Sequence, residues 1–268
     1  MIYIGNQTAF AAATITEPFD YALAHGFDAF EWFPDKRDGV GWDTADLEGP
    51  VRAQVRETAR AAGMRVSVHA RGHANPLLPE GLGWLLEDLE LARDLGAVLL
   101  NIHLYEDAGV PAFVEAIAPL LGQASEAGVT VTIENTPAHT PELFNALFER
   151  LRGVGSLAAS RVGMCLDVGH ANLCPATQNH YLGFVDRLAP ALPILHLHLH
   201  ENWGDADSHL PLFTGPSATD DSGIRALLRR LRARSFSGSM ILEQWPQPPS
   251  LLDAARRRLR QMLGLGDE

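Results

Sequence analysis

Cysteine and long apolar runs are nearly absent from the sequence. Only two of its 268 residues are cysteine, Cys165 and Cys174, which cannot build a framework of disulfide bonds. No run approaches the roughly 18 consecutive apolar residues that a membrane-spanning helix needs. The segment Met1–Gly5 lacks the basic start of a signal peptide, and we interpret it as the beginning of a first strand. These absences predict a cytoplasmic protein without a membrane partner.

Basic residues are also few. The 21 lysine and arginine residues face 33 acidic ones, so the formal net charge is −12, and Lys36 is the only lysine. Because a phosphate backbone binds to a basic face, this balance argues weakly against a nucleic-acid partner, although a local basic patch would be compatible with one. We interpret the arginines of 229–234 and 256–260 as solvated outer faces of helices, and contact with a second copy of the chain stays open. Histidine, in contrast, is abundant, with eleven residues.

Segments with the character of strands alternate with helical patterns along the chain. The predicted strands are Ile2–Gly5, Phe27–Trp32, Arg65–His69, Val98–His103, Thr130–Glu134, Val162–Asp167, Ile194–His200 and Ser239–Glu243. The predicted helices include Val51–Ala62, Gly83–Leu95, Pro111–Ala127, Pro141–Arg152, Ile224–Arg234 and Leu251–Leu263. Strands and helices recur at a spacing of roughly 30 residues, which indicates parallel strands joined by right-handed crossovers. Eight such units predict one (β/α)8 barrel, a TIM barrel of the α/β class, as a single domain over residues 1–268.

A doubly wound open sheet is the alternative fold. It is less favoured, because the sequence has eight regular units and no glycine-rich phosphate loop. The longest connections are predicted over Phe33–Leu47 and Glu201–Asp221. Since long loops at the strand ends of a barrel usually carry function, we expect these two to contribute to a site.

Ionisable side chains fall on one face of the predicted strands. Successive strand residues point to opposite sides, and in Ile194–His200 the leucines share one face while His196, His198 and His200 share the other. The leucines suit the layer of helices, so the histidines point into the barrel. The same alternation places an ionisable residue near the inward C-terminal end of most other strands: Glu31, His69, His103, Glu134, Asp167 and Glu243. The active sites of TIM barrels lie at this end.

Imidazoles interleaved with carboxylates are typical of a divalent metal site. Carboxylates alone could not cluster in a partly buried cup, because desolvation and mutual repulsion would force them to take up protons. A network of ion pairs is the structural alternative, but Arg71 is the nearest basic residue. Other histidines have plainer roles: we expect His196, deepest on its strand, to be a hydrogen-bonded core residue, and His25, His139 and His180 to lie at the surface.

Four segments carry a resemblance to a known family. They are Leu100–His103, Thr132–Thr136, the Asp-x-x-His of Asp167–His170, and His198–Asn202 followed by Asp207–His209. On these motifs the chain resembles, over essentially its whole length, the xylose isomerase-like TIM-barrel superfamily, which includes sugar phosphate isomerases and epimerases, inosose dehydratases and the endonuclease IV family. The metal ligands that the resemblance implies are His69, His103, Glu134, Asp167, His170, His198, Asp207, His209 and Glu243. They would hold one to three divalent ions, zinc or manganese first and cobalt or iron as further options.

The loops of the chain depart from those of the DNA-repair members of this superfamily. His103-Leu104-Tyr105 stands where they usually have His-Pro-Gly, and Phe213-Thr214-Gly215 stands where they have Gly-Glu-Gly. The second strand ends in Glu31, which is more like the sugar-isomerase branch. The implied metal ligands are therefore kept while the DNA-reading loops are not, which argues against cleavage at abasic sites.

The resemblance implies a metal-dependent isomerase or epimerase of a small sugar, sugar phosphate or polyol, with Glu134 and Glu243 as the acid/base pair. A dehydratase would use the same residues. The substrate is expected to contact Glu31, His200, Arg71, Trp203 and Trp32. Trp32, Trp203 and Trp245 either form the wall of the pocket or are packing residues, and both interpretations stay open. The alternative is a hydrolase with two or three zinc ions, of the endonuclease IV type, acting on a phosphodiester or related bond. A non-catalytic protein that binds a metal or small ligand is the third hypothesis.

Overall fold

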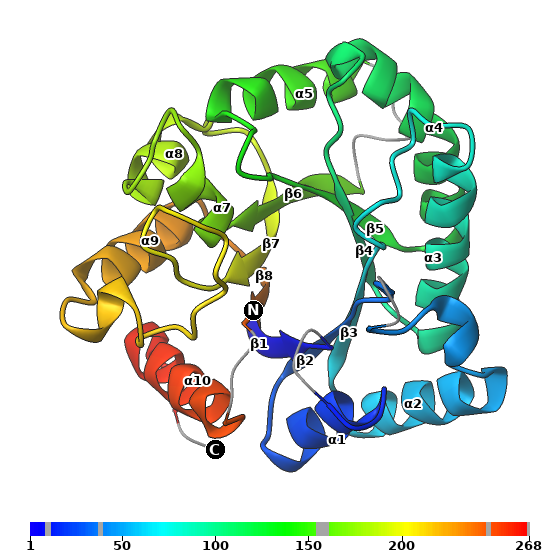
Figure 1. The fold of residues 1–268 in the computed structure, drawn as a ribbon, viewed down its shortest axis with the longest axis horizontal. Helices are drawn as coiled ribbons and strands as arrows, with labels where there is room; N and C mark the ends of the chain where they lie inside the picture. Colours follow the sequence, from blue (N-terminus) through cyan, green and yellow to red (C-terminus); the bar gives the residue numbers. More distant parts are fainter. Residues whose placement is uncertain (9–11, 37–39, 154–160, 245–247, 267–268) are drawn as a thin grey trace.

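Eight parallel strands form a closed barrel. The computed structural model describes residues 1–8, 12–36, 40–153, 161–244 and 248–266. The strands pair in chain order, and β1 also pairs with β8 (Figure 1). Their bounds are β1 Ile2–Gln7, β2 Ala29–Trp32, β3 Arg65–His69, β4 Leu99–His103, β5 Thr130–Glu134, β6 Val162–Asp167, β7 Ile194–Leu199 and β8 Gly238–Leu242. The predicted (β/α)8 barrel is confirmed, and the open sheet is wrong because the first and last strands are hydrogen-bonded to each other.

Helices surround the barrel on its outer side (Figure 1). Their bounds are α1 Glu17–Ala24, α2 Gly49–Ala61, α3 Gly81–Leu95, α4 Gly109–Ala127, α5 Pro141–Gly153, α7 Val168–Leu173, α8 Tyr181–Arg187, α9 Ser222–Ala233 and α10 Ser250–Leu263, with short 3₁₀ helices η1 Thr44–Asp46 and η2 Pro216–Ala218. Gly96 and Gly128 end α3 and α4 with φ values of 68° and 74°, which glycine adopts without the steric cost of a Cβ. None of the helices in the described ranges combines the length and hydrophobicity of a membrane-spanning segment.

The main apolar core lies between the strands and the helices. Trp32 of β2 is fully buried there, with its ring centroid 5.0 Å from that of Phe30 and 5.5 Å from that of Phe19 on α1. The expectation that Trp32 contacts a substrate is therefore wrong. The physical reason is strand alternation, because the residue next to the inward-pointing Glu31 must point outward to the helices.

One irregularity adjusts β7 to its neighbour β6. The pairing register shifts there, and Leu195 has no partner on β6. Its side chain lies against Gly163, where a Cβ would come within 2.4 Å of Leu195 Cγ. Beyond this point β7 continues regularly and sends His196 and His198 into the barrel, where both side chains are fully buried.

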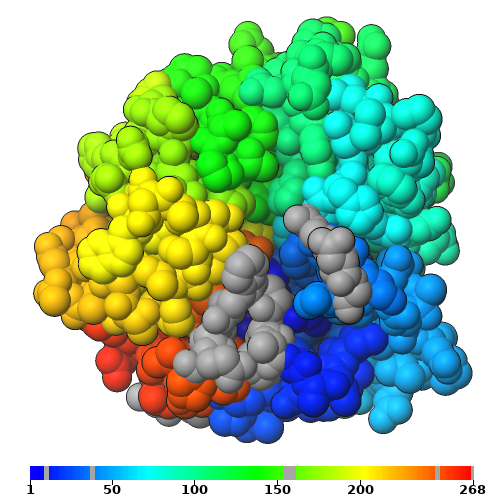
Figure 2. Space-filling model, viewed as in Figure 1, coloured from blue at the N-terminus to red at the C-terminus, as the bar shows by residue number. Residues whose placement is uncertain are grey.

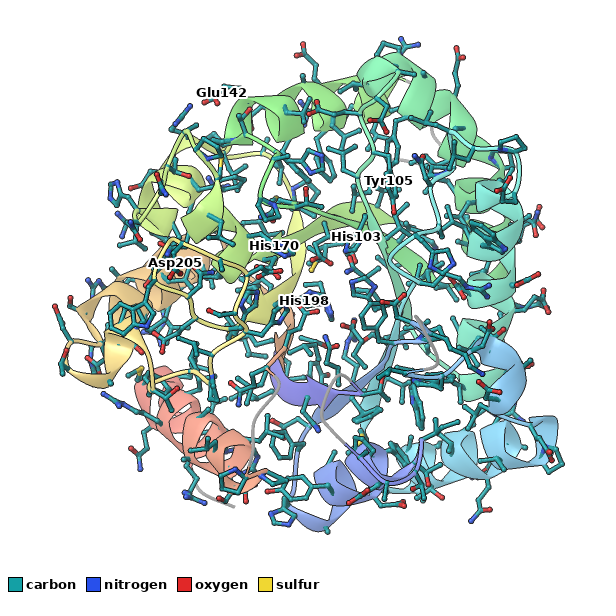
Figure 3. All side chains as sticks on the ribbon, viewed as in Figure 1. His103, Tyr105, Glu142, His170, His198 and Asp205 are labelled. Atoms are coloured by element: carbon teal, nitrogen blue, oxygen red, sulfur yellow. The ribbon has the colours of Figure 1, made fainter. Side chains whose placement is uncertain are left out.

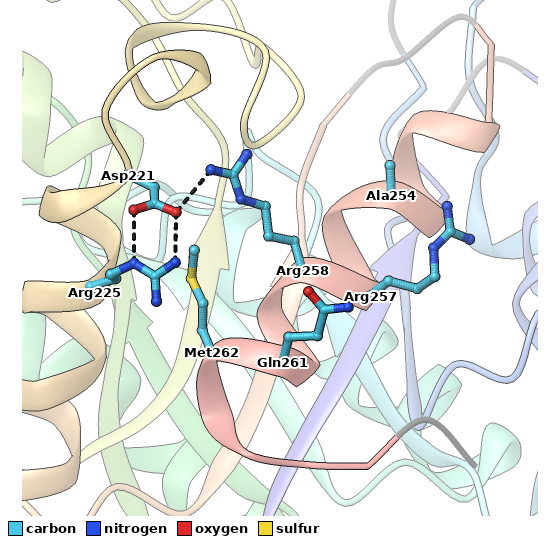
Figure 4. Close-up of a pocket in the computed structure, with 7 residues that line it drawn as sticks. All are labelled: Asp221, Arg225, Ala254, Arg257, Arg258, Gln261 and Met262. Atoms are coloured by element: carbon cyan, nitrogen blue, oxygen red, sulfur yellow. Dashed lines mark hydrogen bonds and ion pairs between the residues drawn. The ribbon is translucent and has the colours of Figure 1, made fainter.

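The arginine-rich helices α9 and α10 enclose a surface hollow of about 400 Å³ on the outside of the barrel (Figure 4). Asp221 lies between them and accepts hydrogen bonds of 2.8 Å from both Arg225 and Arg258. Arg260 reaches Asp28, ahead of β2, at 3.2 Å. The arginines of 256–260 thus lie on the outer face of α10, as expected, and some of them also tie α10 to its neighbours.

Candidate metal centre

The carboxyl ends of the strands hold a cup of histidine and carboxylate side chains. His103, His170 and His198 come from three separate elements and lie toward the middle of the barrel in the axial view (Figure 3). Within the described residues, the nine predicted ligands and His200 occupy four groups, and the ligand atoms of each group lie within 4.8 Å of one another. The central group is Glu134, Asp167, His198 and Glu243, the first flanking group is His69, His103 and Glu134, the second flanking group is His170, His200, Asp207 and His209, and a fourth group combines His69, His198 and Glu243. Glu134, His69, His198 and Glu243 thus each belong to two of these groups.

The central group gathers around the imidazole of His198. The Nδ1 atom of His198 lies 2.8 Å from Glu243 Oε2, 3.3 Å from Glu134 Oε2 and 3.9 Å from Asp167 Oδ2. All four residues are buried, yet within the described part of the chain His198 Nδ1, Glu134 Oε1 and Glu243 Oε2 make no hydrogen bond. Buried polar atoms without partners are costly. Coordination to a divalent cation would satisfy them, so this donor set fits a metal ion.

The first flanking group contains a histidine whose orientation is fixed by the backbone. His69 Nδ1 lies 2.6 Å from the carbonyl oxygen of Ala70 and, as an N–H, donates to it. The lone pair of the neutral ring is then on Nε2, which lies 3.1 Å from Glu134 Oε2. His103 Nε2 lies 3.8 Å from the other oxygen of Glu134. Since a lone pair and a carboxylate repel each other, this geometry calls for a proton or a metal ion between them.

The second flanking group repeats this arrangement twice around Asp207. His170 Nδ1 lies 2.8 Å from the carbonyl oxygen of Asn135, and His209 Nδ1 lies 2.8 Å from that of Glu243. The Nε2 atoms of the two rings lie 3.2 and 3.3 Å from Asp207 Oδ2. Histidine ligands of metals usually donate their second N–H to a carbonyl or carboxylate, which orients the ring. The second flanking group therefore has the donor chemistry of a metal site as well.

Charges within the cup shift the pKa values of its residues. Burial raises the pKa of Glu134 and of Glu243, but the neighbouring histidines, above all His198, outweigh burial and hold both values well below the ordinary range. Burial lowers the pKa of His69, but the hydrogen bond and charge of Glu134 raise it to about 9. For His103, with its longer contact, burial prevails and lowers the pKa to about 4. Glu134 and Glu243 are therefore ionised at neutral pH.

Asparagine side chains hold the carboxylates of the cup in place. Asn101 on β4 donates to Glu134 Oε2 and accepts a 2.8 Å hydrogen bond from Thr132. Asn135 joins the ends of β5 and β6, because its amide group exchanges two hydrogen bonds of 2.9 Å with the backbone of Asp167. Strand alternation places Asn101 and Thr132 inward without indicating this role, and Asn135 is missed. The signal available for Asn135 is its position directly after the strand-end Glu134.

Asp207 and His209 lie on the loop that follows β7, shown in yellow on the open face of the barrel in Figure 2. The loop is closed at its base by reciprocal backbone hydrogen bonds of 2.9 and 2.8 Å between Glu201 and Leu210. The carboxylate of Glu201 accepts two further backbone N–H bonds, at 3.0 and 2.9 Å, from the segment after the loop. A buried acidic side chain thus shapes the loop that presents two of the predicted ligands.

Two residues expected to contact the substrate are engaged elsewhere. The guanidinium group of Arg71 makes hydrogen bonds of 3.0 and 3.1 Å to Asp88 on α3, so the expectation that Arg71 binds substrate is wrong. Glu31 is fully buried, and both of its carboxylate oxygens accept hydrogen bonds from within the barrel. The expected contact between Glu31 and substrate is therefore wrong as well.

Two further tryptophans are candidates for the wall of the pocket. Trp203 follows β7 and is 61% exposed, while Trp245 lies outside the described residues.

The remaining histidines differ in one case from expectation. His196 is fully buried and hydrogen-bonded, and His25 and His180 are exposed, as predicted. His139, in contrast, is buried, because its Nδ1 accepts a 3.1 Å hydrogen bond from the backbone N–H of Thr136. Burial, together with the positive charges of nearby histidines, lowers the pKa of His139 to about 4.

The barrel belongs to a known family. A family profile described as xylose isomerase-like TIM barrel matches residues 19–262. The chain belongs to this family. The resemblance inferred from the motifs around Asp167 and Asp207 is thereby confirmed.

Several solved structures share the fold of this xylose isomerase-like barrel. A D-tagatose 3-epimerase-like protein aligns with a TM-score of 0.76 and 18% identity over 98% of this chain and 97% of its own. D-psicose 3-epimerase from Clostridium cellulolyticum H10, crystallised with D-tagatose, aligns with a TM-score of 0.69 and 14% identity over 97% and 99%. The TTHB071 protein from Thermus thermophilus, soaked with zinc chloride, aligns with a TM-score of 0.66 and 23% identity over 100% and 99%.

A curated relative is similar in sequence over part of its length. The uncharacterized protein MJ1614 of Methanocaldococcus jannaschii is 29% identical over 143 residues, which are 50% of this chain and 52% of that protein. The match thus spans about half of the curated relative.

Proposed function

We propose that this xylose isomerase-like barrel is a divalent-metal-dependent isomerase or epimerase of a small sugar, sugar phosphate or polyol, or a related dehydratase. The observation that carries the proposal is the pair Glu134 and Glu243. Each comes from a different strand end, each lies within 3.3 Å of His198 Nδ1, and each keeps one buried oxygen without a hydrogen bond. Two carboxylates around one shared site are what proton transfer to and from a carbon atom requires.

The ion would be held by Glu134, Asp167, His198 and Glu243, with zinc or manganese as the first choices. When bound, a divalent ion supplies Lewis acidity that polarises the carbonyl group of the substrate and makes the neighbouring C–H bond more acidic. The low pKa of both glutamates keeps them ionised before the reaction, so either one can accept a proton, and the one that acts as the acid must first take up a proton from water. Trp203, exposed in the segment that follows β7, offers an aromatic face to a sugar ring.

The proton transfer uses the two glutamates in turn. One carboxylate accepts the proton of the C–H bond next to the substrate carbonyl, and the electron pair of that bond moves into the carbonyl group. The other carboxyl group, protonated beforehand, returns a proton to the carbon from the opposite side. The similarity in fold to a D-tagatose 3-epimerase-like protein and to D-psicose 3-epimerase supports ketoses as the substrates to test first.

The test is isotope exchange in heavy water. Protein loaded with manganese, cobalt or zinc is incubated in D2O with ketopentoses, ketohexoses and their phosphates, and deuterium at the carbon next to the carbonyl is measured by mass spectrometry. We expect incorporation with the wild type and a loss of about 100-fold or more in Glu134→Gln and Glu243→Gln. The metal content of each variant is measured in parallel, so that loss of the ion is distinguished from loss of the acid or base.

A matched control and a contradicting result complete this test. Glu142 on α5 is exposed and paired with Arg187 at 2.7 Å, so Glu142→Gln changes the same functional group far from the cup and should exchange at the wild-type rate. The proposal is contradicted if the metal-loaded wild type exchanges no substrate proton, or if both glutamate variants keep full activity.

A hydrolase with two or three ions is the second candidate, and the second flanking group favours it, because a single-ion isomerase does not need those ligands. The four carboxylates of the cup, Glu134, Asp167, Asp207 and Glu243, carry four negative charges, which two divalent ions balance. A third ion would leave a positive site that attracts phosphate. Metal content separates the candidates: one exchangeable ion supports the isomerase, whereas two or three tightly held zinc ions together with cleavage of bis(p-nitrophenyl) phosphate support the hydrolase.

A further inference from the structure

Glu31 lies in the interior of the barrel, below the cup, and is fully enclosed. Its Oε1 atom lies 2.8 Å from His198 Nε2, and its Oε2 atom lies 2.8 Å from His196 Nε2 and accepts a 2.9 Å hydrogen bond from Ser67. All four side chains are buried. An ionised carboxylate only accepts hydrogen bonds, so the two imidazoles must donate from their Nε2 atoms.

The contact with Glu31 determines what the other nitrogen of His198 can do. A neutral imidazole carries one proton, and Glu31 requires that proton on Nε2. The lone pair is then on Nδ1, which points at Glu134, Asp167 and Glu243 with separations of 2.8–3.9 Å. His198 therefore connects two layers of the barrel interior, with a fixed carboxylate below and the central group above.

The direction of the Glu31 carboxylate is itself set by several contacts. Ser67 on β3 and His196 on β7 hold Oε2 from two sides of the barrel, which leaves Oε1 directed at His198. The rotation of the His198 ring is thus defined by residues that do not belong to the cup. Carboxylates in this position behind a histidine ligand fix its tautomer and raise its basicity.

We propose that Glu31 is a positioning residue that holds His198 with its Nδ1 lone pair directed at the ion of the central group. This inference rests on the proposed metal centre but not on the proposed sugar chemistry. Glu31→Gln keeps the size of the side chain but removes the charge, and the carboxamide can present an N–H to His198 in place of an acceptor. The ring would then lose the fixed Nε2–H form.

The test measures metal binding without substrate. Metal-free protein is titrated with Co²⁺ while the visible absorption of the ion is recorded. We expect Glu31→Gln to weaken binding at the central group by about 10- to 100-fold relative to wild type. Ser67→Ala is the matched control, because it removes one donor to Glu31 without changing the charge or the contact with His198, and it should shift the affinity less than Glu31→Gln does.

A second measurement covers the case in which Glu31→Gln does not fold. In ¹⁵N NMR of the zinc-loaded wild type, the ring of His198 should show a protonated Nε2 and a metal-bound Nδ1. Binding through Nε2, or wild-type Co²⁺ affinity in a folded Glu31→Gln variant, would overturn the inference. An unchanged affinity with a raised KM would make Glu31 a substrate contact instead. Failure of isotope exchange with every sugar would reject the isomerase and leave this result intact.

Discussion

The carboxylate of Asp167 caps the short helix that carries His170. Asp167 Oδ1 accepts a 2.6 Å hydrogen bond from the backbone N–H of His170, and Asp167 Oδ2 lies 3.4 Å from His170 Nδ1. One side chain at the end of β6 therefore caps the first turn of α7 with Oδ1 while both of its oxygens contact histidines of the cup. Two substitutions of Asp167 can therefore separate its contribution to stability from its contribution to metal binding.

Asp167→Asn and Asp167→Ala should differ in stability but not in metal binding. Asparagine still offers an oxygen to the N–H of His170, whereas alanine removes the cap, which costs about 1 kcal/mol. Both variants lose the negative charge and should bind Co²⁺ much more weakly than wild type. Thermal unfolding in the presence of a chelator and Co²⁺ titration check the two effects. Equal unfolding temperatures for the two variants would show that the cap contributes nothing.

Gly169→Ala should disturb the cup through His200. A Cβ at this position would lie 2.0 Å from Cε1 of the His200 ring, so the ring must move. His200 Nε2 lies 3.1 Å from Asp167 Oδ1, and this contact would be lost. We expect a destabilisation of roughly 1–3 kcal/mol and weaker metal binding.

Gly122→Ala is the matched control for that substitution. Gly122 lies within α4, and among the described residues no atom outside its own helix comes within 4 Å of a Cβ there. Alanine should therefore stabilise the protein by about 0.5–1 kcal/mol without changing metal affinity. Unfolding curves and Co²⁺ titrations of both variants test the contrast, and a Gly169→Ala protein with wild-type metal affinity would contradict it.

Arg71 is expected to contribute to stability and not to substrate binding. Its guanidinium group is almost completely buried against Asp88, so Arg71→Met leaves an unpaired buried carboxylate, which costs about 3–5 kcal/mol. Replacing both partners, as in Arg71→Met with Asp88→Leu, should recover part of that loss. Denaturant unfolding measures both, and KM measured on the folded fraction should not change. A raised KM at unchanged stability would restore the role as a substrate contact.

His139 should make the protein less stable in mild acid. Its pKa is about 4 in the folded chain and near 6.5 when unfolded, so between these values the unfolded state binds more protons. Stability from this group is therefore complete above pH 6.5 and is lost as the pH falls toward 4, by an amount on the order of 3 kcal/mol. His139→Asn keeps an acceptor for Thr136 and should reduce this dependence. The exposed His180 provides the control, since His180→Asn should leave the dependence unchanged.

The barrel could be predicted from the sequence because the pattern of each strand and helix is visible within a short stretch of residues. Several strands show alternation of apolar and polar residues, and most strand ends place an ionisable residue on the inward side, as at Glu134 and Asp167. These patterns predict which residues approach the cup. They do not predict which side-chain atoms contact one another, because those contacts join strands that are distant along the chain. Glu31 and His198, for example, are 167 positions apart.

The predictions that failed have other causes. Two of them concern side chains near the cup: strand alternation already indicates that Trp32, next to the inward-pointing Glu31, turns toward the helices, whereas Arg71 lies beyond the end of β3, where alternation gives no direction. Arg71 is hydrogen-bonded to Asp88 on α3, and Trp32 packs against the aromatic rings of Phe19 on α1 and Phe30 on β2. Residues of the outer helices contact these side chains, and no sequence motif marks those residues as partners.

The backbone ring that Glu201 and Leu210 close has a consequence for the kinetics of ion binding. The two ends of the loop are joined by its own hydrogen bonds, so Asp207 and His209 are presented without the need to order a flexible segment first. Little conformational entropy then remains to be lost when an ion arrives. We expect association at this group to be limited by diffusion and by loss of water from the ion, rather than by folding of the loop.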